Sequence, residues 1–302
     1  MNAVTLRQLE YAVALAEELH FGRAADRCNV SQPGLSTQLR ALEDRLGVAL
    51  FERSKRHVEL TAAGRDVVAR ARQVLTDIQD LATIADAHAG DVVGSVDVAA
   101  IPTMAPYVFP STVATLSKLW PQATLRLSEH RTNDMVAQIA DGKLDVGLLA
   151  LPVDTGGLVV HSLVEESFVL ALPAEHPEAI EGPADPKILA DLPMLLLEDG
   201  HCLRQHALSA CSLAGNVEAT EVSSAGLSTL TQMVAAGIGV TLLPKSSLVV
   251  EARPGSGIVT RPLAGASAGR TLALVWRPSD PRGSLFAAAA ERLGSAWAEL
   301  VA

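Results

Sequence analysis

The chain has 302 residues, of which 49% are hydrophobic and 3% aromatic, and its formal net charge at pH 7 is −10. A single hydrophobic core rarely grows past about 250 residues, so this length favours more than one domain, and the apolar content excludes a disordered chain. No run of 18 uncharged apolar residues occurs, and acidic residues interrupt the apolar pattern at the start, which argues against a membrane span and a signal peptide. We therefore expect a cytoplasmic protein.

Charge distribution and cysteine content set two further limits. The net negative charge argues against a nucleic-acid partner, but residues 20–57 carry seven basic and four acidic side chains, so one small basic face is expected on an acidic protein. The three cysteines, Cys28, Cys202 and Cys211, cannot form a structural disulfide framework in a reducing compartment. Any disulfide between them would be transient and functional.

The first ninety residues begin with helical patterns. Apolar side chains at helical spacing predict one helix over 5–18 and a second over about 22–29. A third helix follows, with Ser31 as its N-cap, Pro33 in its first turn and Gly47 at its end. The apolar stripe of this third helix consists of Leu35, Leu39, Leu42 and Leu46. Two short extended runs, over 48–53 and 57–60, then flank a polar tip and suggest a wing.

The third predicted helix carries side chains that suit a DNA major groove. Its exposed N-terminal residues would reach base edges and phosphates, and arginines of the wing would meet the DNA backbone. The candidate contacts are Ser31, Gln32, Pro33, Ser36, Thr37, Arg40, Arg53 and Arg56. By spacing alone, a small helical bundle with a solvated basic face is an equal alternative.

A resemblance favours the DNA-binding interpretation. The stretch LRQLEYAVALAEELHFGRAADRCNVSQPGLSTQLRALEDRLGVALFER, together with the later LTAAG, closely resembles the winged helix-turn-helix of LysR-type transcriptional regulators. The resemblance implies that double-stranded DNA is a partner, contacted mainly through the helix that begins at Ser31. Residues 1–60 are accordingly expected to form the DNA-binding domain.

A long helix is predicted next, over residues 61–92, with Thr61 as its N-cap. Its narrow apolar seam consists of Val67, Ala71, Leu75, Ile78, Leu81, Ile84 and Ala85. Such a seam suits pairing with a second copy of the same helix, and a core helix of the same domain is the alternative. The resemblance implies a dimerising linker helix, and a winged helix-turn-helix protein needs a dimer to read two half-sites.

After Gly94 the pattern changes to short strands separated by helices, which indicates a parallel α/β sheet. The first set is expected over 95–101, 106–119, 123–129, 133–141 and 144–151. A strand-rich connection covers 158–173. The second set and a closing helix are expected over 193–198, 202–211, 217–223, 227–236, 240–244, 258–263, 271–278 and 285–300.

Two such α/β lobes resemble the periplasmic-binding-protein-like effector domain that LysR-type regulators carry. The resemblance implies a multidomain α/β chain: a winged helix-turn-helix, a long dimerisation helix, and a two-lobed effector domain over 93–302. Lobe I would cover about 93–165 and 268–302, and lobe II about 166–267.

Ligands of open α/β sheets bind beyond the carboxyl ends of strands, often between two lobes. Three places qualify here, at residues 101–103, 131–133 and 198–202, because each offers hydroxyls or free N–H groups at a helix start. A lone threonine at a strand end is more often a helix cap than a ligand contact. Thr103 and Thr132 are therefore candidates that need a second observation.

Cys202 and Cys211 are candidates for redox chemistry. Their C-x8-C spacing differs from that of zinc sites, and His201 and His206 would point to different faces of a helix, so we expect no metal and no cofactor. Inert buried thiols are the default alternative. Cys202, however, lies at a predicted helix N-terminus, where unpaired N–H groups, Arg204 and His201 favour the thiolate, which is the form that peroxide attacks.

The spacing of the two cysteines also constrains any bond between them. Nine residues of helix separate their Cα atoms by about 13 Å, whereas a disulfide needs them within about 7 Å. The disulfide can form only if the helix unwinds. This obstacle argues against a resting disulfide and suits a switch, because oxidation would have to remodel the segment.

A second resemblance concerns this segment. The stretch EDGHCLRQHALSAC, with the later MVAAGIGVTLLP and LALVWRPSDP, closely resembles peroxide-sensing members of the LysR family. The resemblance implies that Cys202 reacts with hydrogen peroxide and Cys211 resolves the product. It also implies a peroxide pocket formed by Thr103, Thr132, His201, Gln205 and Arg270. Gln205 departs from the acidic residue of the better-known pattern, and Cys28 is expected to be a packed core thiol.

The leading hypothesis is a peroxide-sensing transcriptional regulator that is not an enzyme. It would sit on promoter half-sites as a dimer of dimers and change its contacts with RNA polymerase on oxidation. A LysR-type regulator that responds to a metabolite, with incidental cysteines, is the first alternative. A thiol peroxidase is disfavoured by the DNA-binding match, and a transport binding protein by the start of the chain, which lacks the pattern of a signal peptide.

Overall fold

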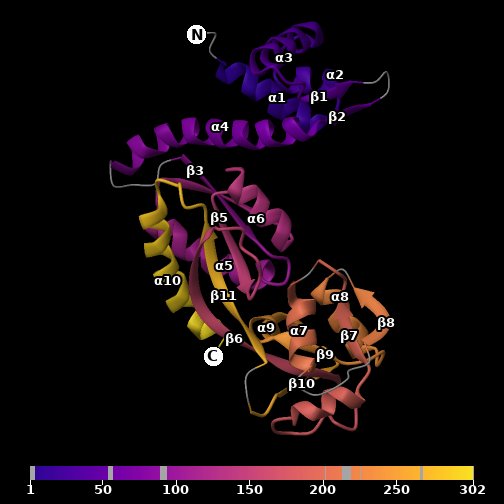
Figure 1. Cartoon of the computed structure of the whole chain (residues 1–302). Coiled ribbons are helices and arrows are strands. Elements are labelled where there is room, and N and C mark those ends of the chain that lie inside the picture. The colour runs from indigo at the N-terminus through magenta and orange to yellow at the C-terminus, as the bar shows by residue number, and fades with distance from the viewer. Residues whose placement is uncertain are drawn as a thin grey trace. The chain divides into compact units, whose positions relative to one another are not determined.

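A computed structural model of the chain describes residues 4–53, 57–88, 94–200, 202–212, 219–224, 226–265 and 268–301. Contacts between Cα atoms divide the chain into two compact units, residues 1–85 and residues 86–302. Figure 1 shows both units coloured along the chain.

The first unit contains the three predicted helices and the predicted wing. Its elements are α1 (Leu6–Glu18), α2 (Phe21–Arg27), α3 (Gln32–Leu46), β1 (Phe51–Arg53), β2 (Val58–Leu60) and the start of α4 (Ala62–His88). β1 and β2 pair antiparallel, which confirms a two-stranded wing. The predicted helices and strands are thus confirmed with shifts of one to three residues at their ends.

Local side-chain bonds set the helix boundaries of this unit. The Ser31 hydroxyl accepts a hydrogen bond from the Gly34 N–H at 3.3 Å at the start of α3, and the Thr61 hydroxyl accepts one from the Gly64 N–H at 2.8 Å at the start of α4. Gly47 ends α3 with a φ of +72°, which glycine adopts without the steric cost of a side chain. Both predicted N-caps and the predicted C-terminal glycine are confirmed.

Only part of each predicted apolar stripe is buried. Leu35, Leu39 and Leu42 of α3 are fully buried, but Leu46 is 38% exposed because the last turn of α3 extends beyond the core. Along α4, Val68 packs in the core of the first unit, and Ala71 is also buried. Further along the helix the apolar side chains of Ile78, Leu81 and Ile84 are exposed in the single chain.

The second unit is built on a seven-stranded sheet with the order β10-β6-β11-β5-β3-β4, to which β9 adds by pairing with β6. Its strands are β3 (Gly94–Ala100), β4 (Ala123–Glu129), β5 (Val146–Leu151), β6 (Val159–Pro173), β9 (Thr241–Pro244), β10 (Ile258–Pro262) and β11 (Gly269–Trp276). β6 is one continuous strand that pairs with β11 in its first half and with β9 and β10 in its second half. Figure 1 shows β6 passing from lobe I into lobe II.

The predicted parallel arrangement holds for only part of this sheet. β3 is parallel to both β4 and β5, but β11 is antiparallel to β5 and β6, and β9 and β10 are antiparallel to β6. β11 runs in the opposite direction because the chain re-enters lobe I from lobe II rather than through a helix of the same lobe. The parallel sheet predicted from the first set of strands is therefore confirmed for β3, β4 and β5, whereas the strands near the lobe boundary are antiparallel.

Helices complete the two lobes. Lobe I carries α5 (Ala105–Leu119), α6 (Thr132–Ala140) and α10 (Gly283–Val301), and its core includes the fully buried Phe286 and Trp297. Lobe II carries a parallel pair, β7 (Met194–Leu197) and β8 (Ala219–Ser224). Its helices are α7 (Cys202–Ser212), α8 (Leu227–Ala235) and α9 (Leu248–Glu251), with the short turns η1 (Pro186–Asp191) and η2 (Lys245–Ser247). Among the described residues, no helix is long and apolar enough to cross a membrane.

Candidate functional site

Cys202 lies where lobe II meets lobe I. The fully buried strand β7 ends at Leu197, a short turn reaches Gly200, and α7 begins at Cys202. Gly200 has a φ of +92°, a conformation that glycine adopts without strain. The Cys202 side chain is a free thiol and is only 7% exposed. The prediction that Cys202 stands at a helix N-terminus is thus confirmed.

Helix α7 contributes to both cores. Cys202 packs in the apolar core of lobe I, whereas Leu203 and Ala207 pack in the core of lobe II. One turn after Cys202, the Nε2 atom of His206 lies 3.2 Å from the carbonyl oxygen of Pro152, which follows β5 of lobe I. The start of α7 is therefore held between the lobes rather than on the surface of one of them.

The electrostatic setting of Cys202 differs from the expected one. Burial raises the pKa of the Cys202 thiol, and this effect outweighs the Arg270 charge, the Thr132 hydroxyl and the N–H groups at the start of α7, which all lower the pKa. The thiol is therefore mainly protonated at neutral pH. The expected preference for the thiolate considered the helix N-terminus, which does lower the pKa, but not the burial that lobe I supplies.

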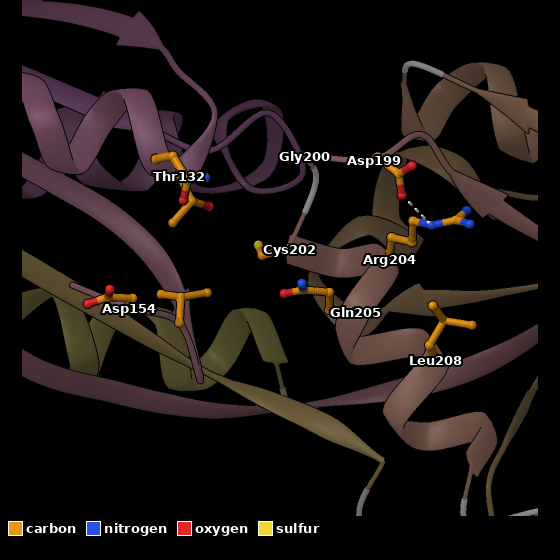
Figure 2. A pocket seen from close by; sticks show the side chains of 10 residues that line it. Thr132, Asp154, Asp199, Gly200, Cys202, Arg204, Gln205 and Leu208 are labelled. Carbon is orange, nitrogen blue, oxygen red and sulfur yellow. Dashed lines mark ion pairs between the residues drawn. The ribbon is translucent and has the colours of Figure 1, made fainter. Parts of the chain in front are cut away.

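Arg270, and not Arg204, is the cation that acts on Cys202. Arg204 donates a hydrogen bond to the Leu197 carbonyl at 2.9 Å and forms an ion pair with Asp199 at 3.0 Å, so its guanidinium is engaged within lobe II (Figure 2). Residues two positions apart in a helix lie on different faces. The predicted contribution of Arg204 to the thiolate is thus wrong for this conformation.

Three of the predicted pocket residues lie close together around Cys202. Thr103, Thr132 and Arg270 are all buried. Arg270 donates one hydrogen bond to the Thr103 hydroxyl at 3.1 Å and another to the Thr103 carbonyl at 3.2 Å. A narrow crevice is lined by Ile101, Pro102, Thr103, Arg131, Thr132, Gly200 and Cys202. The structure thus brings three side chains of lobe I to one thiol of lobe II.

The Thr132 hydroxyl is buried and has no hydrogen-bond partner among the residues that the structure describes. It is nevertheless close enough to the Cys202 thiol to lower its pKa, although the contact does not satisfy the distance and angle limits of a hydrogen bond. An unpaired buried hydroxyl costs free energy. Its position beside the sulfur is therefore suited to a small polar ligand rather than to folding.

A pocket of about 540 Å³ opens beside the thiol. Its lining includes Cys202 and Gln205 from lobe II and Thr132 and Asp154 from lobe I (Figure 2). The predicted pocket residue Gln205 therefore lies where it can reach a ligand, whereas His201 lies outside the described residues. In the parts of the chain that the structure describes, no group of three or more His, Cys, Asp or Glu side chains could hold a metal ion.

Cys211 lies in the last turn of the same helix as Cys202, and its side chain is not among those described. Because α7 is continuous from Cys202 to Ser212, nine residues of helical rise separate the two Cα atoms by about 13 Å. In this conformation Cys202 and Cys211 therefore cannot form a disulfide.

The candidate DNA-binding residues lie on the first unit. Gln32, Pro33, Thr37 and Arg40 are exposed on α3, and Ser36 is half-buried. Ser31 is exposed but its hydroxyl caps α3, and the Thr37 hydroxyl donates to the Pro33 carbonyl at 2.9 Å. The side chain of Arg53 is not among those described, and Arg56 lies outside the described residues.

Part of the predicted basic face is neutralised. Arg27 pairs with Glu17 at 2.6 Å and Arg23 with Glu18 at 3.1 Å, so two of the seven basic residues in that region are engaged with acidic side chains of α1. Cys28 is half-buried and packs against the core of the first unit, as predicted, and burial raises the pKa of its thiol. Arg40 on α3 is exposed and points away from the leucines that form the core of the unit.

Both parts of the chain match known protein families. Residues 6–65 match the family described as bacterial regulatory helix-turn-helix protein, lysR family, and residues 89–298 match the LysR substrate binding domain. The chain is 41% identical over 290 residues to the DNA-binding transcriptional dual regulator OxyR of Escherichia coli K12, a match that covers 96% of this chain and 95% of the relative. This chain belongs to the OxyR group of the LysR family.

Solved OxyR structures have the same architecture. A full-length OxyR variant from Pseudomonas aeruginosa is 38% identical and gives a TM-score of 0.80, covering 97% of this chain and 95% of that one. A hydrogen-peroxide-bound OxyR mutant from Corynebacterium glutamicum is 36% identical with a TM-score of 0.68, covering 98% and 94%. The predicted fold class, a winged helix-turn-helix followed by a two-lobed α/β effector domain, is confirmed for this LysR-family chain.

Two residues that pack beside this OxyR-like site were not predicted from the sequence. Glu166 accepts a hydrogen bond from Arg270 at 2.7 Å, and both side chains are fully buried. His206 is buried and contacts lobe I. The sequence contains an indication of each residue. Glu166 directly precedes the apolar run SFVLALP in one strand. His206 follows Cys202 by four residues, which places His206 and Cys202 on one helix face.

Replacing Thr132 by valine should separate ligand chemistry from folding. Among the described residues the hydroxyl has no hydrogen-bond partner to lose, so the free energy of unfolding is expected to stay within about 1 kcal/mol of its original value or to rise. The same change is expected to raise the pKa of the Cys202 thiol further. Alkylation of Cys202 by iodoacetamide, followed by mass spectrometry across a pH series, should therefore shift to higher pH.

The matched control is Thr112→Val, because the buried Thr112 hydroxyl donates to the Val108 carbonyl at 2.7 Å within α5. It should leave the alkylation profile of Cys202 unchanged. An identical alkylation profile in Thr132→Val and the original chain would show that the Thr132 hydroxyl does not act on the thiol.

Proposed function

We propose that this chain is a transcriptional regulator that senses hydrogen peroxide through Cys202 and a disulfide to Cys211. The observation that carries the proposal is a buried, free thiol at a helix start, beside an unpaired threonine hydroxyl and a buried arginine. Membership of the OxyR group supports the same proposal, since its curated relatives include hydrogen peroxide-inducible genes activators.

The first proposed step is a two-electron oxidation of Cys202. Its deprotonated sulfur attacks one oxygen of hydrogen peroxide, so that an S–O bond forms as the O–O bond breaks. The other oxygen leaves as hydroxide and becomes water with the proton that the thiol released. Arg270 and the Thr132 hydroxyl would stabilise the leaving oxygen by charge and by a hydrogen bond.

The second proposed step joins the two cysteines. The Cys211 sulfur attacks the sulfenic sulfur of Cys202, the S–O bond breaks, and a second molecule of water leaves. The helical separation of about 13 Å must first be removed, so α7 unwinds. A cellular dithiol would reverse the reaction by thiol–disulfide exchange.

The remodelled effector domain would change DNA binding by changing how copies of the chain associate with one another. We expect the exposed seam of α4 at Ile78, Leu81 and Ile84 to pair with a second copy, within a linker that covers about residues 61–92. Two such dimers on promoter half-sites would form the dimer of dimers, and oxidation would alter its contacts with RNA polymerase. The DNA-binding domain is proposed to cover residues 1–60.

The experiment that tests the redox proposal is peptide mapping of the intact protein before and after one equivalent of peroxide. A peptide pair linked through Cys202 and Cys211 should appear only after oxidation, and dithiothreitol should remove it. If Cys202 were oxidised to sulfenic or sulfinic acid with no linked peptide, the sensing proposal would fail at its second step.

For the DNA interface we propose that α3 enters the major groove with Gln32, Ser36 and Thr37 near base edges and Arg40 near a phosphate. Arg40→Ala is expected to lower promoter affinity about tenfold and to reduce the slope of log affinity against log salt concentration by about one. Fluorescence anisotropy with a promoter fragment at four salt concentrations measures both quantities.

Arg70→Ala removes the same charge from an exposed position on α4 and serves as the control. Equal losses of affinity in the two variants would mean that overall charge, and not the position of Arg40 on α3, determines binding.

A further inference from the structure

His206 on α7 forms a hydrogen bond between the two lobes. It stands one turn after Cys202 on α7, so the two side chains share a helix face. The imidazole is 6% exposed, and its Nε2 atom lies 3.2 Å from the carbonyl oxygen of Pro152 in lobe I. Because a carbonyl oxygen can only accept, Nε2 carries the proton of this hydrogen bond.

The other ring nitrogen of His206 is left unpaired. Its Nδ1 atom is buried and has no hydrogen-bond partner within the described part of the chain. Burial lowers the pKa of His206, and together with the nearby Arg270 charge it outweighs the hydrogen bond to Pro152, which raises the pKa, so the imidazole is neutral when α7 is docked. A neutral imidazole with one N–H and one acceptor matches the single bond to Pro152 that is seen.

This bond spans the segment that must move. His206 lies near the middle of the stretch from Cys202 to Cys211, which has to contract from about 13 Å to about 7 Å for the disulfide to form. Such a contraction displaces the backbone on both sides of His206, whose side chain is bonded to the other lobe. The hydrogen bond from His206 to Pro152 is therefore one of the contacts that oppose the change.

We propose that His206 is a positioning residue for the second oxidation step: its bond to Pro152 holds α7 on lobe I and thereby slows disulfide formation. The inference rests on the proposed function, since it concerns the step in which Cys211 captures the oxidised Cys202. It assigns His206 no contact with peroxide, because Thr132 and Arg270 are the groups that act on the sulfur.

Two substitutions at this position distinguish the bond from simple packing. His206→Gln keeps an N–H donor at about the reach of Nε2, whereas His206→Leu fills a similar volume and leaves the Pro152 carbonyl without its donor. Both steps are measured on the full-length protein by rapid mixing with peroxide, acid quenching, blocking of free thiols and mass spectrometry. The loss of the Cys202 thiol reports the first step, and the linked peptide reports the second.

The expected result is a split between the two rates. In His206→Leu the rate of disulfide formation should rise about two- to tenfold, which corresponds to the loss of one hydrogen bond, while the rate of Cys202 thiol loss stays within twofold of the original. His206→Gln should restore the slower disulfide formation. If the leucine variant does not fold, His206→Asn supplies the comparison, because its amide is too short to reach Pro152.

Other outcomes overturn the inference. Equal rates of disulfide formation in the original, glutamine and leucine chains would show that the bond does not control the step. An equal rise of both rates would show a general loosening of the site. If the original chain showed no peroxide-dependent loss of the Cys202 thiol, the proposed function itself would fail, whatever stands at position 206.

Discussion

Replacing Cys202 by serine is expected to abolish the peroxide response while leaving DNA binding by the reduced protein intact. A serine hydroxyl is not ionised near neutral pH and does not react with peroxide, so neither the sulfenic acid nor the disulfide can form. Serine is also close to cysteine in size, so the contacts of the buried site with lobe I should persist. DNase I footprints on a promoter fragment, with and without peroxide, measure the response.

Cys28→Ser is the matched control for this experiment. Cys28 belongs to the DNA-binding unit and not to the effector unit that holds Thr132 and Arg270, and burial raises the pKa of its thiol. The footprint of Cys28→Ser should change with peroxide as that of the original chain does. A footprint that still changed with peroxide in Cys202→Ser would remove Cys202 from the sensing mechanism.

The second large effect is expected at Glu166, which pairs with Arg270 where neither side chain is exposed. One Glu166 oxygen accepts from Arg270 at 2.7 Å and the other from the Ser246 N–H at 2.8 Å. Glu166→Ala would leave the Arg270 charge buried without its partner. Such a loss typically costs about 3–5 kcal/mol of unfolding free energy, and Arg270 would also lose the contact that orients it toward Thr103.

Urea unfolding followed by tryptophan fluorescence measures this loss in the right unit. The three tryptophans, Trp120, Trp276 and Trp297, all lie in the effector unit, so their emission reports that unit and not the DNA-binding one. Alkylation of Cys202 in the same variant reports the effect on the thiol.

Glu178→Ala gives the comparison. Glu178 is 41% exposed and pairs with Arg261 at 3.2 Å, and Arg261 keeps hydrogen bonds to three backbone carbonyls after the change. The expected cost is about 1 kcal/mol or less. Similar losses in the two variants would contradict the assignment of Glu166 as the buried partner on which Arg270 depends.

Features that depend on neighbouring residues could be predicted from the sequence. Ser31, Thr61 and Gly47 set helix ends through bonds within four residues, so short patterns predicted those ends correctly. The start of α7 at Cys202 is of the same kind. The exposure of Leu46 was not predicted, because it depends on where the core of the unit ends and not on helical spacing.

The chemistry at Cys202 could be predicted only in part because distant residues control it. The family resemblance indicated Thr103, Thr132 and Arg270, which the structure places beside the thiol. Sequence proximity favoured Arg204, which instead bonds within lobe II. The burial that raises the pKa of the thiol comes from lobe I, whose residues are far from Cys202 in the chain, and no local pattern reports it.

The continuous strand β6 limits how an oxidised effector domain can signal. β6 is hydrogen-bonded to β11 in lobe I and to β9 and β10 in lobe II, so one continuous strand crosses the boundary between the lobes. A rotation of one lobe against the other would break hydrogen bonds between these strands, whereas unwinding α7 breaks none of them. We therefore expect oxidation to change the surface around α7 while the two lobes keep their relative positions. A neighbouring subunit would then contact a changed surface and not a domain that has closed.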